Sequence, residues 1–210
     1  MNYLVTNKKI YDVLASEYEK KSQLRKNFNN GIIDRFVKFI STGNKILDVG
    51  CAIGLDIETL RSKGFKVVGI DISPKMVNFA RKRNSGCQII EDNFMDINFS
   101  AQFDGIWAQS FIHLFPKSEV SNVFQKIKKL LKFEGVAHIA TSKEIESSEG
   151  YIEKRDYKNK IKRFRKYWTR EELRNFILDQ GFSITDYYET DDPAPVKNKK
   201  WMVFIIKKNR

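Results

Sequence analysis

Short apolar runs rich in β-branched residues alternate along most of the chain with longer segments in which apolar residues recur every three or four positions. The short runs predict buried strands, and the longer segments predict amphipathic helices. The predicted strands are 46–49, 65–71, 88–92, 103–108 and 136–140. The predicted helices are 8–28, 32–40, 74–83 and 117–131, with another beginning at 55–60. This alternation implies a mostly parallel sheet covered by helices on both faces.

The pattern changes after residue 143. Residues 144–168 open with a polar turn and continue as a run of lysines and arginines with interleaved aromatic residues. A capping box at 169–172 predicts another helix, which ends at Gly181, and two strands follow at 182–188 and 201–206. We expect a single domain over 1–210, with 1–42 as an N-terminal helical cap and 144–168 as a basic insert or lid.

Three carboxylates stand at or near the ends of three consecutive predicted strands: Asp48, Asp71 and Asp92. The carboxyl ends of parallel strands meet at one edge of a sheet, where α/β proteins bind their ligands. The first strand also runs directly into a loop of small residues and then into a helix N-terminus, which favours a nucleotide-like ligand. The sequence therefore predicts a ligand site at this edge.

The small residues of that loop are Gly50, Ala52 and Gly54. Their spacing does not fit the Gly-x-Gly-x-x-Gly pattern of dinucleotide-binding loops, and the Gly-Lys-Ser/Thr of a phosphate-binding loop is absent. Asp48 precedes the loop and Asp71 ends the next strand, so carboxylates flank it. Carboxylates suit a ligand that brings ammonium or hydroxyl donors rather than a pyrophosphate.

Five motifs now occur in a recognisable order. They are Tyr11-Asp-x-x-Ala15-x-x-Tyr18, residues 46–54, residues 68–74, Phe103-Asp-Gly-Ile-Trp107 and Phe111-Ile-His113. In this order they resemble the class I S-adenosylmethionine-dependent methyltransferases of the single-domain type that acts mainly on small molecules, and the resemblance covers nearly the whole chain. The resemblance implies a methyltransferase enzyme with S-adenosylmethionine as cofactor. It also implies a Rossmann-like, doubly wound α/β sheet, mostly parallel, with an antiparallel C-terminal strand.

The resemblance also implies roles for individual residues. Gly50, Ala52 and Gly54 would form the turn against the methionine part of the cofactor, and Asp71 would bind the ribose hydroxyls. Tyr18 would contact the cofactor or the substrate. The other expected cofactor positions are Asp48 before the loop, Ile72 and Met76 against the adenine, Asp92 with Asn93 or Phe94 at the adenine edge, and Ala108 and Gln109 beside the methionine moiety.

Two departures from the family pattern stand out. Ala52 occupies a position that is usually glycine, where an added methyl costs little unless the residue needs a positive φ. Lys132-Phe-Glu-Gly135 replaces the usual Lys-Pro-Gly-Gly turn before the fifth strand, which bears on the geometry of that turn and not on activity.

A sulfonium cofactor is already a reactive electrophile, so the protein mainly positions a nucleophile in line and excludes water. A general base is needed only for an acceptor that is protonated at the working pH. His113, just after the fourth strand, is the candidate base; a buried structural imidazole is the alternative interpretation. His138, within the fifth strand, has a weaker claim.

The formal net charge of +12 attracts anions, although lysines distributed over the whole surface would give the same number. The basic, aromatic segment 144–168 favours a small anionic acceptor, a carboxylate or a phosphate, with an oxygen or nitrogen nucleophile. A structured RNA or tRNA is the alternative partner. A non-catalytic regulator that binds S-adenosylmethionine is a hypothesis of a different class.

Composition adds few constraints. The sequence has no apolar run of about 18 residues and no signal-peptide core, so we expect a cytoplasmic protein without membrane spans. Cys51 and Cys87 match no metal-ligand spacing, and the two histidines do not complete one. We therefore expect free thiols and no structural metal, and the oligomeric state is open.

Overall fold

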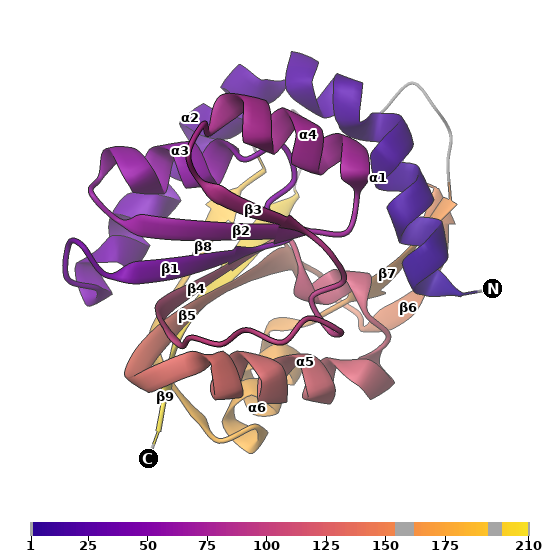
Figure 1. The fold of residues 1–210 in the computed structure, drawn as a ribbon. Coiled ribbons are helices and arrows are strands. Elements are labelled where there is room, and N and C mark those ends of the chain that lie inside the picture. The colour runs from indigo at the N-terminus through magenta and orange to yellow at the C-terminus, as the bar shows by residue number, and fades with distance from the viewer. Residues whose placement is uncertain (1, 154–161, 193–198, 210) are drawn as a thin grey trace.

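A computed structural model describes residues 2–153, 162–192 and 199–209. Its main sheet has the strand order β3-β2-β1-β4-β5-β9-β8, and β6 and β7 form a separate hairpin (Figure 1). The strands are β1 Lys45–Val49, β2 Lys66–Asp71, β3 Gln88–Glu91, β4 Phe103–Gln109, β5 Leu131–Lys143, β6 Ser148–Glu153, β7 Lys162–Tyr167, β8 Phe182–Asp191 and β9 Lys200–Lys208. The helices are α1 Tyr3–Lys20, α2 Ser22–Phe36, α3 Leu55–Ser62, α4 Pro74–Arg83, α5 Lys117–Leu130 and α6 Arg170–Asp179, with 3₁₀ turns at Val37–Phe39 and Ile112–Leu114.

Strands β1 to β5 pair in parallel, and the C-terminal strand β9 pairs antiparallel with both β5 and β8. Strand β1 lies between β2 and β4, so the chain leaves β1 toward one edge of the sheet and later returns to build the other. This is the topological switch point at which open α/β sheets bind ligands. The predicted fold class is confirmed, including the antiparallel C-terminal strand.

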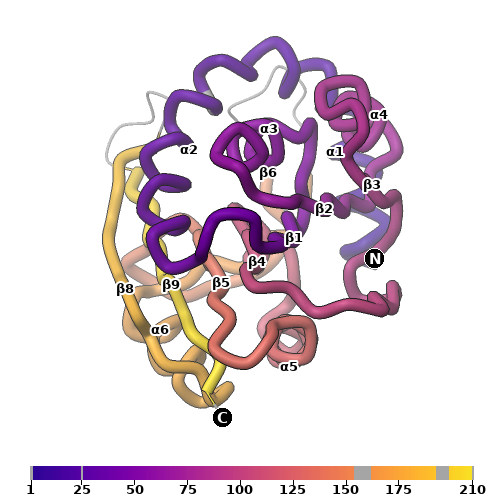
Figure 2. The backbone as a smooth tube through the Cα atoms, turned by 60° about the vertical axis from the view of Figure 1, so that its left-hand side comes forward, coloured from indigo at the N-terminus to yellow at the C-terminus, as the bar shows by residue number. Residues whose placement is uncertain are grey.

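Helices cover both faces of the sheet (Figures 1 and 2). Residues of α5 and α6 pack against one face, and residues of α2, α3 and α4 pack against the other. Helix α1 packs instead on the loop after β1 and on the start of α4, through Ile10, Leu14 and Tyr18 against Ile53 and Met76. Helix α1 therefore lies over the ligand-binding edge of the sheet.

The predicted N-terminal helices 8–28 and 32–40 were wrong in their boundaries. The structure has α1 up to Lys20, a break at Lys21, and a second helix that continues to Phe36. The break separates two different packing tasks, because Leu14 faces the β1–α3 loop whereas Phe36 faces the sheet. One straight helix cannot serve both, and no glycine or proline marks the change of direction in the sequence.

The basic segment 144–168, expected as a basic insert or lid, contains two strands in its described part. Its described residues form the antiparallel hairpin β6–β7, and residues 154–161 lie outside the described residues. Four consecutive residues of β7, Arg163 to Lys166, are buried. On one face Lys166 places its Nζ 3.0 Å from Oε2 of Glu172, whose backbone N–H donates to Thr169 Oγ1 at 3.1 Å. The Glu172 backbone N–H therefore makes one half of the expected capping box, whereas the Glu172 side chain neutralises Lys166.

The turn before β5 adopts a left-handed conformation at Glu134, with φ of +61°. A non-glycine residue in this region costs about 1–2 kcal/mol. The altered turn sequence therefore keeps a geometry that suits glycine at position 134, and places a glutamate there instead. Glu134 pairs with Lys207 at 3.0 Å, which offsets a small part of that strain.

Candidate active site

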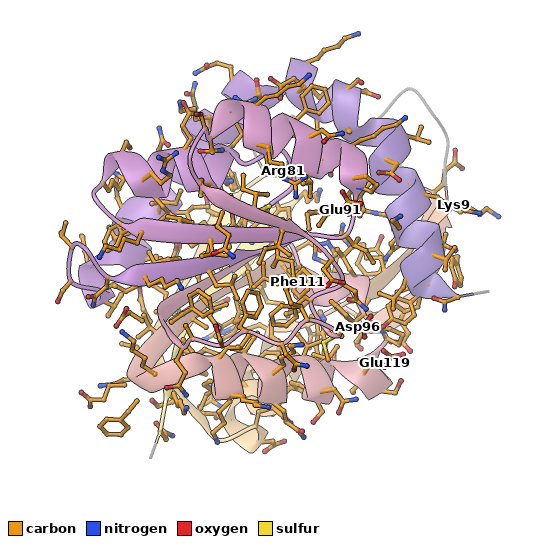
Figure 3. The ribbon with its side chains drawn as sticks, viewed as in Figure 1. Lys9, Arg81, Glu91, Asp96, Phe111 and Glu119 are labelled. Atoms are coloured by element: carbon orange, nitrogen blue, oxygen red, sulfur yellow. The ribbon has the colours of Figure 1, made fainter. Side chains whose placement is uncertain are left out.

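A cavity of about 240 Å³ opens at the carboxyl ends of the parallel strands. One side is formed by the β1–α3 loop and the ends of β2, β3 and β4, and the other by α1, the start of α2, the 3₁₀ turn Ile112–Leu114 and β7. Phe111, one of its lining residues, lies between the strand ends and α5 (Figure 3). The cavity therefore occupies the switch point predicted from the strand pattern.

The loop after β1 needs small residues for two different reasons. Gly50 has φ of +71°, and a Cβ there would lie 2.8 Å from the Phe111 ring. Gly54, with φ of +75°, packs against α4, where a Cβ would lie 3.0 Å from Ala80. Gly50 lines the cavity, whereas Gly54 does not. Ala52 adopts φ of +46°, so this position does need a positive φ and its methyl carries a strain that glycine would avoid.

Asp71 is held in place by backbone donors. Its Oδ2 accepts from the Ala52 N–H at 2.9 Å, and its Oδ1 accepts from the Ser73 N–H at 2.9 Å. Burial raises the pKa of Asp71 to about 6, and these two N–H groups oppose that rise. Each carboxylate oxygen has a second lone pair, so Asp71 can accept further hydrogen bonds from ligand hydroxyls.

Two more carboxylates lie at this end of the cavity. Asp48 is buried, and its Oδ2 has no hydrogen-bond partner among the residues that the structure describes. Burial, followed by the nearby Asp56 and Asp71, raises the pKa of Asp48 well above its usual range. Asp56 accepts from Asn29 Nδ2 and Trp107 Nε1, each at 2.8 Å. A buried acceptor without a donor suits a ligand that brings an ammonium group.

Gln109 is oriented by a histidine beneath it. Its Oε1 lies 2.7 Å from His138 Nε2, and the His138 ring stacks on Trp107 with centroids 3.7 Å apart. Burial lowers the pKa of His138 to about 3, so the imidazole is neutral near pH 7 and donates its single proton to Gln109. With its carbonyl oxygen engaged, Gln109 presents its amide N–H groups as donors in the cavity wall.

His113 is buried in the 3₁₀ turn and lines the cavity. Its Nδ1 lies 3.1 Å from Thr141 Oγ1, and its ring meets Trp201 edge-on with centroids 6.4 Å apart. These contacts hold the imidazole in one orientation, as either a general base or a structural residue requires. Both interpretations of His113 stay predictions.

Two arginines of β7 form part of the opposite wall. Arg163 Nη1 donates to the Tyr11 hydroxyl at 2.6 Å, and Arg165 Nη2 donates to Ser142 Oγ at 2.8 Å. Both side chains are buried and line the cavity. Burial, followed by the nearby Arg163, lowers the pKa of Arg165. The lining thus carries carboxylates from the strand ends of the main sheet and guanidinium groups from the hairpin strand β7, and these two parts are called the carboxylate end and the arginine end of the cavity.

The chain matches a family described as a methyltransferase domain over residues 46–135. It is 31% identical over 137 residues to YqeM of Bacillus subtilis, whose methyltransferase name is provisional; the match spans 60% of this chain and 53% of that protein. An uncharacterised methyltransferase of Alkaliphilus oremlandii is 27% identical over 142 residues, or 68% of this chain and 64% of its own length. The chain therefore spans less than two thirds of these curated relatives.

Solved structures share the fold over nearly the whole chain. The DhpI–SAH complex superposes with a TM-score of 0.77 at 14% identity, over 99% of this chain and 97% of that one. The chain is therefore similar over residues 46–135 to a methyltransferase domain, and it has the fold of the S-adenosylmethionine-dependent methyltransferases. Another methyltransferase of this fold, the 1,6-didemethyltoxoflavin-N1-methyltransferase of Burkholderia thailandensis, matches with a TM-score of 0.71 at 16% identity, over 96% of this chain and 90% of that chain.

The cavity brings together most of the residues predicted from the resemblance. The predicted residues that line it are Tyr18, Asp48, Gly50, Ala52, Asp71, Ile72, Asp92, Asn93, Phe94, Gln109 and His113. Three others do not line it: Gly54, which packs on α4, and Met76 and Ala108, which are fully buried in the core. Whether any of these residues contacts the cofactor stays a prediction.

Several residues that line the cavity were missed by the sequence analysis. Asn29, Asp56, Lys199 and Trp201 reach the cavity from separate segments, and no local sequence signal marks them. Arg163 and Arg165 were seen only as part of a basic run. Cations fall on both faces of this strand, Arg163 and Arg165 on one and Lys166 on the other, so no alternation of apolar and charged residues marked it as a strand.

Other expectations concern metals, thiols and membranes. Within residues 2–153, 162–192 and 199–209, no group of three or more His, Cys, Asp and Glu side chains is arranged to hold a metal ion. Cys51 and Cys87 are both free thiols. No helix in the described parts of the chain has the length and apolar character needed to cross a bilayer.

Proposed function

We propose that this protein transfers the methyl group of S-adenosylmethionine to an oxygen or nitrogen atom of a small anionic molecule. The observation that carries the proposal is the single cavity with Asp48 and Asp71 at one end and Arg163 and Arg165 at the other. The cofactor is a cation with ribose hydroxyls, so it suits the carboxylates. An anionic acceptor suits the arginines.

The carboxylate end fits the cofactor by its chemistry. Asp71 offers free lone pairs to two ribose hydroxyls while its backbone donors keep it oriented. Within the described parts of the chain the buried Oδ2 of Asp48 has no donor, and an amino-acid ammonium group would supply one. Ile72 and Phe94 offer apolar surface to an adenine ring, and Gly50 leaves space where a side chain would meet Phe111.

Bound there, S-adenosylmethionine supplies an electrophilic methyl group on a sulfonium sulfur. The remaining work belongs to the protein, which has to hold the acceptor in line and keep water away. His113, fixed by Thr141, would accept a proton from an acceptor whose nucleophile is protonated. An acceptor that is already deprotonated would leave His113 only a positioning role.

The burial of the positively charged side chains favours a small acceptor over RNA. In the described part of 144–168, Arg163, Arg165 and Lys166 are buried, and Lys166 is neutralised by Glu172. Exposed lysines such as Lys9 on α1 project away from the body of the molecule (Figure 3). A large RNA needs exposed cations that track its backbone, whereas buried arginines can reach only a ligand inside the cavity.

The test uses S-adenosylmethionine labelled in its methyl group, incubated with the protein and a cell extract, with and without nuclease treatment. We expect label in small molecules, independent of nuclease, and almost no transfer by the Asp71→Ala variant. Loss of labelled product after nuclease treatment would instead identify an RNA methyltransferase. Cofactor binding without transfer to any fraction would favour the regulator hypothesis.

A further inference from the structure

Two positively charged side chains are buried in the cavity wall, which is unusual because arginine is rarely buried without a charged partner. Arg163 and Arg165 are only 6% and 5% exposed. They are two residues apart on β7, so both side chains lie on the same face of that strand, the face that borders the cavity.

Among the described residues no carboxylate forms a hydrogen bond or an ion pair with Arg165, and Glu144 acts on it only as a nearby charge. The recorded hydrogen bond of Arg165 goes to the Ser142 hydroxyl, and its Nε has no hydrogen-bond partner among the described residues. No ion pair of Arg165 occurs within the described parts of the chain. The neighbouring Lys166 shows the contrast, because its Nζ lies 3.0 Å from the Glu172 carboxylate. One buried cation on β7 has a partner built into the fold, and the next one does not.

A buried, unpaired charge is costly, because the group gives up its hydration without gaining an ion pair. Arg165 also lies beside a second guanidinium, which repels it. A guanidinium stays protonated even in this setting, so it does not escape the cost by losing its proton. A bound anion would remove both costs at once and would gain charge-assisted hydrogen bonds.

The residues around Arg163 and Arg165 indicate the chemical character of the rest of the ligand. Strand β7 packs against the 3₁₀ turn that carries His113, and His113 and Arg165 are anchored on the consecutive residues Thr141 and Ser142 of β5. Leu4, Phe111, Leu114, Phe115 and Trp201 contribute apolar or aromatic surface to this part of the lining, and Asn7, Asp192 and Lys199 contribute polar groups beside them. The subsite thus combines an anion-binding end with an apolar wall.

We infer that the methyl acceptor is a small organic acid, a carboxylate or a phosphate ester, whose anionic group is bound by Arg163 and Arg165 and whose apolar body lies against Phe111 and Trp201. This inference rests on the proposed function, since it assigns the acceptor end of the same cavity. Arg165 is the main specificity determinant, because no carboxylate among the described residues pairs with it.

The test measures binding of benzoate, phenyl phosphate and the neutral benzamide to the protein saturated with S-adenosylhomocysteine, by titration calorimetry. Three variants are compared with the wild type: Arg165→Met, Arg165→Lys and Lys162→Met. Lys162 is the matched control, because it is an exposed cation on the same strand and does not line the cavity. We expect at least one acid to bind about tenfold more tightly than benzamide, and we expect Arg165→Met to abolish that preference.

Arg165→Lys should keep part of the preference, since it retains the charge and loses the fork geometry. Lys162→Met should leave it unchanged. The inference is overturned if neither acid binds more tightly than benzamide, or if Arg165→Met binds the acids as well as the wild type. Preference for benzoate or for phenyl phosphate separates the two kinds of acid. Failure of the proposed function would show differently, as absent S-adenosylhomocysteine binding before any acid is added.

Discussion

The two ends of the cavity carry opposite charges, and the protein supports those charges in different ways. At one end, backbone N–H groups orient Asp71, and side-chain donors satisfy Asp56. At the other end, Arg163 donates to the Tyr11 hydroxyl and Arg165 donates to the Ser142 hydroxyl. The carboxylate end is built largely by backbone geometry, and the arginine end by side chains from distant segments.

This difference explains how one cavity can serve two ligands of opposite charge. A cationic cofactor is attracted to the carboxylates and repelled by the guanidinium groups, and the reverse holds for an anionic acceptor. The charges would therefore favour one relative orientation of the two ligands, with the reacting atoms between them. The predictions below test whether the two ends are as independent as this account requires.

The largest expected effect concerns the two neighbouring cations on β7. Glu172→Gln leaves Lys166 buried without a countercharge, and we expect it to lower the free energy of unfolding by about 3 kcal/mol. Arg165→Met should be neutral or stabilising, because it removes a buried charge that the protein does not pair. Urea denaturation of both variants measures this.

Glu171→Gln is the matched control for Glu172, since it changes an exposed carboxylate on the same helix turn. It should shift stability by no more than about 0.5 kcal/mol. Equal destabilisation by Glu171→Gln and Glu172→Gln would contradict the role given to Lys166.

The second prediction concerns pH at the carboxylate end. The pKa of Asp71 is raised to about 6, so this carboxyl is protonated below that pH and cannot accept two hydroxyl hydrogen bonds as an anion. Affinity for S-adenosylhomocysteine should therefore be constant well above pH 6 and fall by up to about tenfold per pH unit below it. Calorimetry across this range measures the effect, and Asp71→Asn should remove the step near pH 6. The same step in Asp71→Asn would assign it to another group.

The smallest expected effect concerns the turn before β5, away from both ends of the cavity. Glu134→Gly relieves the left-handed strain in the turn before β5, and we expect a gain of about 1 kcal/mol in the free energy of unfolding. The lost pair with Lys207 costs a few tenths of that amount. Thermal unfolding measures it, with cofactor affinity unchanged. A loss of stability would mean that the Lys207 pair outweighs the strain.

The difference between the two ends of the cavity, one built by backbone geometry and the other by distant side chains, also explains what could be predicted from the sequence. A close backbone approach demands small residues at fixed spacing, so the loop at Gly50 and the carboxylate of Asp71 are visible in a short stretch of chain. The conformation of Ala52 could not be predicted from the sequence, because only the folded loop reveals its positive φ. The strand character of β7 was hidden because both of its faces carry cations, and hydrophobic alternation was absent. The break between α1 and α2 has a tertiary cause and leaves no local signal.

The most direct test of the account is the affinity for S-adenosylhomocysteine, measured by calorimetry in the wild type, in Asp71→Ala and in Arg165→Met. The account predicts that Asp71→Ala weakens binding by at least about tenfold, since hydrogen bonds to a charged group contribute about 1.5–3 kcal/mol each. Arg165→Met should stay within about twofold of the wild type. Unchanged binding in Asp71→Ala, or an equal loss in both variants, would contradict the assignment of the cofactor to the carboxylate end.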